Sequence, residues 1–269
     1  MLDVVLGQVL TCMSTPAAVT IKYPIDFSIR TSVLFLNLAM GRPSLRGKIL
    51  RTGMRLMFRS GYQGATVRDI CAAAGAPQGS FTNHFRSKEA FAEEVLDQYF
   101  DYLKGLVKQA LNDETRTPRE RLKRYLDIIT GKLECDRWRI GCLIGDLSLE
   151  TSSQSKRLRA RLDAIFQEWR TLFASCIAAA QSAGEVDSTF DATELAEFLL
   201  ASWEGAILRM KVARGPAALE RFKTIVFETV FKTPGTVSAR TRRVSGRSAR
   251  RGPNRGPGRA AVNRKAGWR

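Results

Sequence analysis

Apolar residues recur at helical spacing along most of the chain. Leu45, Ile49 and Leu56 repeat at intervals that place them on one side of a helix, with arginines and a lysine between them. Similar apolar stripes run through residues 87–103, 118–133, 155–182, 193–212 and 216–231. No stretch shows convincingly the alternation of apolar and polar residues that a half-buried strand requires. The pattern therefore predicts an all-α fold.

Short helices with distinct start and stop signals are expected between the first helix and residue 91. Thr66, followed three residues later by Asp69, has the pattern of a capping box that begins a helix. Gly75 ends this helix, and Pro77 suits the first turn of the next one. Ser87 is a suitable N-cap for a longer helix. Two short helices joined by a glycine turn are therefore predicted at the centre of this region.

The segment from Thr66 to Phe91 resembles the DNA-binding signature of the TetR family of transcriptional regulators. The matching features are the capped short helix, Ala74-Gly75, Gly79-Ser80-Phe81, His84-Phe85 and Ser87-Lys88-Glu89. The resemblance implies a three-helix helix-turn-helix domain over residues 41–90 and a helical ligand-binding and dimerisation domain over 91–232. It further implies a homodimeric repressor that binds an inverted repeat in double-stranded DNA and is released by a small-molecule inducer.

The start of the second short helix carries the residues that we expect to read DNA sequence. A helix-turn-helix inserts the N-terminal part of its second helix into the major groove. Gln78 can form two hydrogen bonds with an adenine edge, and Ser80 can bond with several bases. Gly79 would let the backbone approach the bases closely. We therefore predict base contacts from these three residues.

Phosphate contacts are assigned by the family resemblance and position the protein without reading sequence. The residues are Thr66, Arg68, Thr82, Asn83, His84 and Lys88. Many family members have tyrosine where this chain has Thr82, so a hydroxyl is retained here without the aromatic reach. His84 could instead serve only in packing, and the basic residues Arg46, Lys48 and Arg51 could be a solvated face or weak DNA contacts.

Positive charge is concentrated in two parts of the chain, whose formal net charge is +17. Residues 41–89 contain nine Lys or Arg and two acidic residues, and residues 232–269 contain twelve and none. Such a balance favours an acidic partner: DNA, RNA or an anionic membrane. Residues 233–269 contain few large apolar side chains and are predicted to be a disordered basic tail. The alternative function is non-specific nucleic-acid binding driven by this tail, and a tail without any role also remains open.

Enzyme chemistry finds little support in the sequence. The chain has one histidine and five cysteines, an odd number without paired CxxC spacing, so neither a zinc site nor a disulfide framework is implied. There is no Ser-His-Asp set, phosphate-binding loop or dinucleotide fingerprint. We therefore predict a protein that is not an enzyme, has no cofactor or metal, does not bind a membrane, and resides in the reducing cytoplasm.

The segment from Arg139 to Ser148 resembles the Gly-Cys-Leu segment of a TetR branch that includes regulators of electrophile detoxification. In that branch a cysteine at the position of Cys142 can act as a sensor. Lys211 lies in a second region of resemblance, and an ammonium group near the thiol would lower its pKa. The alternative is that Cys142 is a small buried hydrophobe.

Two further expectations concern the C-terminal helices. Trp203, together with Trp138 and Trp169, could line an apolar ligand pocket or simply pack in the core. The helices over 193–212 and 216–231 carry more apolar surface than lone exposed helices would, so we expect them to form a dimer bundle.

The first 40 residues show no clear function. Residues 4–21 lack charge but contain Gly7, Gln8 and Pro16, which makes a membrane helix a poor interpretation. We expect residues 1–40 to be a disordered leader or an untranslated segment preceding a true start at Met40. A tryptic peptide from residues 1–39 in the native protein would contradict the second interpretation.

Overall fold

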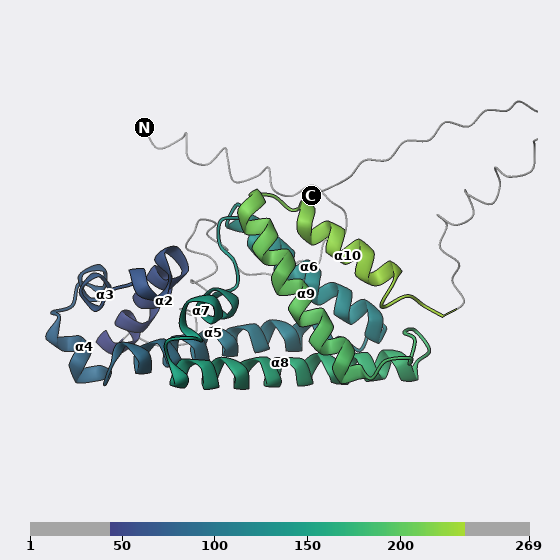
Figure 1. Ribbon diagram of the computed structural model, residues 1–269, viewed down its shortest axis with the longest axis horizontal. Helices are drawn as coiled ribbons and strands as arrows, with labels where there is room; N and C mark the ends of the chain where they lie inside the picture. The colour runs from purple at the N-terminus through teal and green to yellow at the C-terminus, as the bar shows by residue number, and fades with distance from the viewer. Residues whose placement is uncertain (1–43, 235–269) are drawn as a thin grey trace, which may run out of the picture. The chain divides into compact units, whose positions relative to one another are not determined.

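The computed structural model describes residues 44–234, which fold into nine helices without any strand among them (Figure 1). The all-α prediction is confirmed. The predicted leader and basic tail lie outside the described residues. The helices are α2 (Leu45–Gly64), α3 (Val67–Ala74), α4 (Gly79–His84), α5 (Lys88–Leu111), α6 (Pro118–Cys135), α7 (Leu143–Thr151), α8 (Lys156–Ser182), α9 (Ala192–Ala213) and α10 (Ala217–Glu228).

Helices α2, α3 and α4 pack around an aromatic cluster together with the first turn of α5. The rings of Phe81, Phe85 and Phe91 lie with their centroids 4.8–5.2 Å apart. All three side chains are buried. Gly53 of α2 lets the Phe91 ring approach the helix backbone, because a Cβ at residue 53 would lie 2.2 Å from Phe91 Cζ. The cluster therefore ties α4 to the long helices α2 and α5.

Helices α5 and α8 run alongside each other in the C-terminal part of the protein (Figure 1). Lys104 Nζ of α5 lies 3.0 Å from Glu168 Oε1 of α8. Asp97 of α5 pairs with Arg161 of α8 in the same way. Exposed pairs of this kind contribute little each, so the association rests mainly on the buried apolar side chains between α5, α6, α8 and α9. Trp169 and Trp203 are among the largest of these side chains.

The short helix α7 packs against α2 on one side and against α5 and α8 on the other. At its C-terminal end, a Glu150 carboxylate oxygen accepts a hydrogen bond from the Gln63 backbone N–H, at 3.1 Å. Gln63 also donates through its side chain to Gln154, at 2.7 Å. Cys142 is the N-cap residue at the other end of α7. One nine-residue helix therefore connects Cys142 with the end of α2.

Helix α9 packs on α8, and α10 packs on α9 and contacts α6. A capping box formed by Asp191 and Glu194 begins α9. Arg119 of α6 fixes the end of α10 by donating to the carbonyl oxygens of Phe231 and Phe227, at 2.6 and 2.9 Å. Within the described part of the chain, no helix is both long and apolar enough to span a bilayer.

Candidate DNA-binding surface and ligand cavity

Helix α3 begins and ends with the signals that its sequence predicts. Thr66 Oγ1 accepts a hydrogen bond from the Asp69 backbone N–H at 3.1 Å, as in a capping box. The Asp69 carboxylate, however, accepts from the Thr66 hydroxyl instead of from the Thr66 backbone, so the box is only half formed. Gly75 ends the helix with φ of 59°, a left-handed conformation that glycine adopts without strain.

Helix α4 starts later than the sequence suggests. Pro77 lies two residues before it, and the Pro77 carbonyl accepts a hydrogen bond from the Ser80 N–H at 2.9 Å. Gln78 is the N-cap residue and Phe81 is the buried anchor of the helix. Because the anchor turns the opposite side of α4 outward, the predicted base-reading residues face solvent: Gln78 and Gly79 are exposed and Ser80 is half-buried.

The residues assigned to phosphate contacts lie on α4 and at the starts of α3 and α5. All but Lys88 are exposed: Thr66, Arg68, Thr82, Asn83 and His84. Lys88 is half-buried, and its Nζ donates to the Gln63 carbonyl at 3.3 Å and lies 4.6 Å from the centre of the Tyr62 ring. Burial lowers the Lys88 pKa. Its ammonium group is therefore already engaged with the end of α2.

A cavity lies between α2 and the C-terminal helices. Its empty space, including the part that is open to solvent, is about 860 Å³. Phe58, Arg55 and Arg59 come from α2, whereas Tyr125 comes from α6 and Trp203 from α9. A helix of the three-helix unit thus forms part of the wall of this cavity.

Aromatic and aliphatic side chains form most of the wall of this cavity, and the charged side chains that line it are Arg55, Arg59, Lys132, Asp136 and Glu204. Trp169 and Trp203 both line it, whereas Trp138 is not among its lining residues. The Tyr102 hydroxyl and Glu204 Oε1 are shielded from solvent and have no hydrogen-bond partner among the described residues. Buried polar atoms without partners are uncommon in native proteins. They mark positions at which a bound molecule could supply the missing hydrogen bonds.

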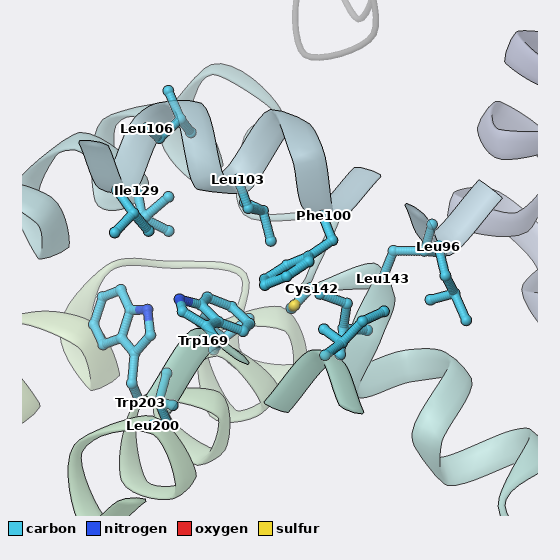
Figure 2. Packing of buried hydrophobic residues seen from close by; sticks show 14 of the residues in the cluster. Leu96, Phe100, Leu103, Leu106, Ile129, Cys142, Leu143, Trp169, Leu200 and Trp203 are labelled. Carbon is cyan, nitrogen blue, oxygen red and sulfur yellow. The ribbon is translucent and has the colours of Figure 1, made fainter. Parts of the chain in front are cut away.

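Cys142 lies at the wall of the cavity and is 6% exposed. Figure 2 shows its sulfur pointing toward the rings of Phe100 and Trp169. Burial raises the pKa of the thiol well above its ordinary value, and the negative charge of Glu204 raises it further. The backbone N–H groups of Gly145 and Ile144, at the start of α7, oppose part of this rise. The resting side chain is therefore a protonated thiol.

Lys211, considered from the sequence as a group that would lower the pKa of this thiol, forms an ion pair with another residue. Lys211 Nζ donates to both carboxylate oxygens of Asp146, at 2.9 and 2.8 Å. Its aliphatic chain passes over Gly141, one residue before Cys142. The ammonium charge is thus compensated by Asp146, and the carboxyl group beside the thiol is that of Glu204.

Glu204 is the main residue that the sequence analysis missed. It follows Leu200 by four residues on α9, so it occupies a position in the same row as buried apolar side chains. Burial, partly opposed by a hydrogen bond with Cys142, raises the pKa of its carboxyl group to about 7. A carboxylate in an otherwise apolar row was the sequence signal that could have identified it.

Comparisons with known proteins cover both parts of the structure. Residues 49–95 match the family described as bacterial regulatory proteins, tetR family, and residues 118–226 match the tetracyclin repressor-like C-terminal domain. The chain is similar to the HTH-type transcriptional repressor DhaR of Mycobacterium sp. strain GP1. The two are 39% identical over 199 residues, which are 74% of this chain and 98% of DhaR.

Solved structures show the same arrangement of helices. The crystal structure of the regulatory protein TetR from Rhodobacter sphaeroides superposes with a TM-score of 0.65 at 31% identity, covering 68% of this chain and 97% of that one. Reduced NemR from E. coli gives a TM-score of 0.64 at 26% identity, covering 72% and 100%. The matched families and relatives are transcriptional regulators, not enzymes. The chain therefore belongs to the TetR family and is a DNA-binding transcriptional regulator.

Proposed function

We propose that this protein is a homodimeric repressor that leaves its operator when an inducer occupies the cavity. The observation that carries the proposal is the position of α2, which is part of the DNA-binding unit and also forms a wall of the cavity. A molecule that fits the cavity only when α2 has shifted would favour a conformation with displaced recognition helices. A preference of about 3 kcal/mol for that conformation would weaken operator binding on the order of 100-fold.

Operator recognition is assigned to the exposed side of α4 and its surroundings. Gln78 and Ser80 would contact base edges, with Gly79 allowing close approach. Thr66 and Arg68 would bind phosphates at the start of α3, while Thr82, Asn83, His84 and Lys88 would do so from α4 and α5. In a dimer, two such surfaces would read half-sites about one helical turn apart, which corresponds to an inverted repeat.

Dimerisation is assigned to the outer face of α9 and α10. Large apolar side chains stand exposed there: Phe198 is 48%, Val212 is 68% and Ile225 is 54% exposed. A groove between the two helices is lined by Ala206 and Phe222 among others. An apolar face of this kind favours association with a second copy of the chain. Sedimentation analysis of Phe198→Glu should show a monomer if the assignment is correct.

Cys142 is assigned to the sensing of electrophiles. It is the N-cap residue of α7 and its thiol borders the cavity. A covalent adduct on the sulfur would add atoms where the side chain is almost fully enclosed, and the resulting displacement of α7 would reach the end of α2. Trp203 would then shape the cavity and Lys211 the hollow beside it, without activating the thiol. If electrophiles still release DNA from the Cys142→Ser variant, Cys142 serves only in packing.

The decisive experiment is a binding selection from random duplex DNA. The full chain and a shortened chain of residues 40–233 should enrich the same inverted repeat if the helix-turn-helix reads sequence. Affinity that depends steeply on salt, lacks sequence preference and disappears with the tail would instead support non-specific binding by residues 233–269.

A further inference from the structure

Cys142 and Glu204 approach each other over Gly145. Both side chains line the cavity described above and a second hollow beside it. A Cβ at residue 145 would lie 2.5 Å from Glu204 Oε2 and 3.9 Å from Cys142 Cβ. The absence of a side chain at residue 145 therefore lets the carboxyl group of α9 reach the first turn of α7, next to the thiol.

No cation compensates the carboxyl group of Glu204 among the described residues. Lys211, the nearest candidate from the sequence, is bound to Asp146 at 2.8 Å. Glu204 Oε1 is enclosed and lacks a hydrogen-bond partner. Four titratable groups from three helices face Glu204: the thiol of Cys142 and the carboxylate of Asp146 at the start of α7, and the phenols of Tyr99 on α5 and Tyr125 on α6. The thiol is the one that can pass its proton to Glu204 and become a nucleophile.

We propose that Glu204 is the proton acceptor that activates Cys142 toward small α,β-unsaturated carbonyl compounds in the cavity. The inference rests on the proposed role of Cys142 as the sensor, and it names both the chemistry of the signal and the residue that makes the reaction possible. The electrophile class follows from the cavity wall, where aromatic rings accommodate an apolar body and the Tyr102 hydroxyl can donate to a carbonyl oxygen.

The reaction needs no other reactant. The Glu204 carboxylate takes the thiol proton while the Cys142 sulfur attacks the β-carbon, so that an S–C bond forms and the C=C π bond breaks. The electron pair moves onto the carbonyl oxygen as an enolate. Glu204 then returns the proton to the α-carbon, which regenerates the carbonyl and the carboxylate. Thiol and alkene combine into one thioether without oxidation or reduction.

The position of Glu204 also explains how an enclosed thiol can react at all. Burial keeps Cys142 protonated, and the thiolate is the reactive form. A carboxyl group with a pKa of about 7 is half ionised near neutral pH and can accept a proton there. The backbone N–H groups at the start of α7 would stabilise the thiolate as it forms.

The test measures alkylation of individual cysteines in the full-length protein with methyl vinyl ketone as the probe. Peptide mass spectrometry follows Cys142, and the exposed Cys135 serves as a reference for probe reactivity in the same sample. The variants are Glu204→Gln, Glu204→Asp and a matched control, Glu197→Gln, which changes an exposed glutamate on the same helix. Each is measured between pH 5.5 and pH 9 after its thermal unfolding has confirmed a folded protein.

The expected wild-type rate at Cys142 rises through about pH 7 as Glu204 ionises. Glu204→Gln should lose this rise and react on the order of 10²-fold more slowly at pH 8. Glu204→Asp should keep the rise at a reduced rate, and Glu197→Gln should behave like wild type. Equal or faster alkylation in Glu204→Gln would overturn the inference, because a carboxylate that only repels the thiolate slows the reaction.

Operator binding measured on the same samples separates this inference from the proposed function. Glu204-dependent alkylation of Cys142 that leaves DNA affinity unchanged supports the role of Glu204 and refutes the sensor function. Release of DNA from Glu204→Gln at the wild-type rate, through an adduct on Cys142, refutes the role of Glu204 and leaves the sensor function intact.

Discussion

The contact between Gly53 and Phe91 makes Gly53→Ala a sharp test of the packing that holds the recognition helix. The new methyl group would lie 2.2 Å from Phe91 Cζ and 2.5 Å from Phe91 Cε1, far inside van der Waals contact. Phe91 is fully buried and touches Phe81 of α4. The ring cannot turn into solvent, so α2 and α5 must separate or the aromatic cluster must shift.

The magnitude follows from two opposing effects. Overpacking of a dense core costs about 1–3 kcal/mol, and a clash this deep falls at the upper end of that range. Alanine improves the helix propensity of α2 by up to about 1 kcal/mol. The net loss of unfolding free energy is therefore about 1–2 kcal/mol. At about 2–4 °C for each kcal/mol in a chain of this size, the melting temperature should fall by roughly 2–8 °C.

The assay is thermal and urea unfolding of Gly53→Ala beside a matched control, Gly105→Ala. Gly105 lies on the exposed side of α5, and nothing lies within 4 Å of a Cβ placed there. The control should gain up to about 1 kcal/mol from helix propensity alone. Equal stability of the two variants would refute the reasoning, because it would mean that Phe91 does not pack against the α2 backbone as described.

Three other predictions concern separate parts of the molecule. Gln78→Ala should weaken binding to the selected inverted repeat by about 1–3 kcal/mol, measured by fluorescence anisotropy. Unchanged affinity would show that the recognition helix has been assigned wrongly. Arg119→Met should lower the unfolding free energy in urea by about 1–3 kcal/mol, since the carbonyls of Phe227 and Phe231 lose their donors. Because the Glu204 pKa rises on folding from 4.5 to about 7, the folded state binds more protons in that range, and stability should fall as pH rises through it. The fall should be roughly 2–3 kcal/mol, and Glu204→Gln should lack it in urea unfolding at pH 5 and pH 8.

Local signals allowed most of the helical organisation to be predicted. Ser87 caps α5 as expected, and Gly75 ends α3. These features depend on residues within one helical turn of each other, so the sequence states them directly. The error at Pro77 is also local: its fixed φ suits a first helical turn, but the turn that precedes α4 has the same requirement.

The cavity could not be predicted in the same way, because it depends on distances between helices far apart in the chain. Cys142 and Lys211 stand out in the sequence, and both do lie close to one another. The sequence does not show which carboxyl group each of them contacts, because either Asp146 or Glu204 could pair with Lys211 and either could lie beside Cys142. Only the packing of α7 against α9 shows that Lys211 binds Asp146 and that Glu204 meets Cys142.

Helix α7 connects Cys142 with the end of α2, and this connection has a thermodynamic consequence for protein that is already bound to DNA. Cys142 stands at one end and Glu150 holds the Gln63 backbone at the other. If a reversible modification at the first end weakens operator affinity by some factor, the operator must disfavour that modification at equilibrium by the same factor. Operator-bound copies would then be modified at a higher concentration of the signal than free copies. A cell that contains both would lose its free copies first, so the regulated genes would stay silent until the signal exceeds a threshold set by the excess of free protein.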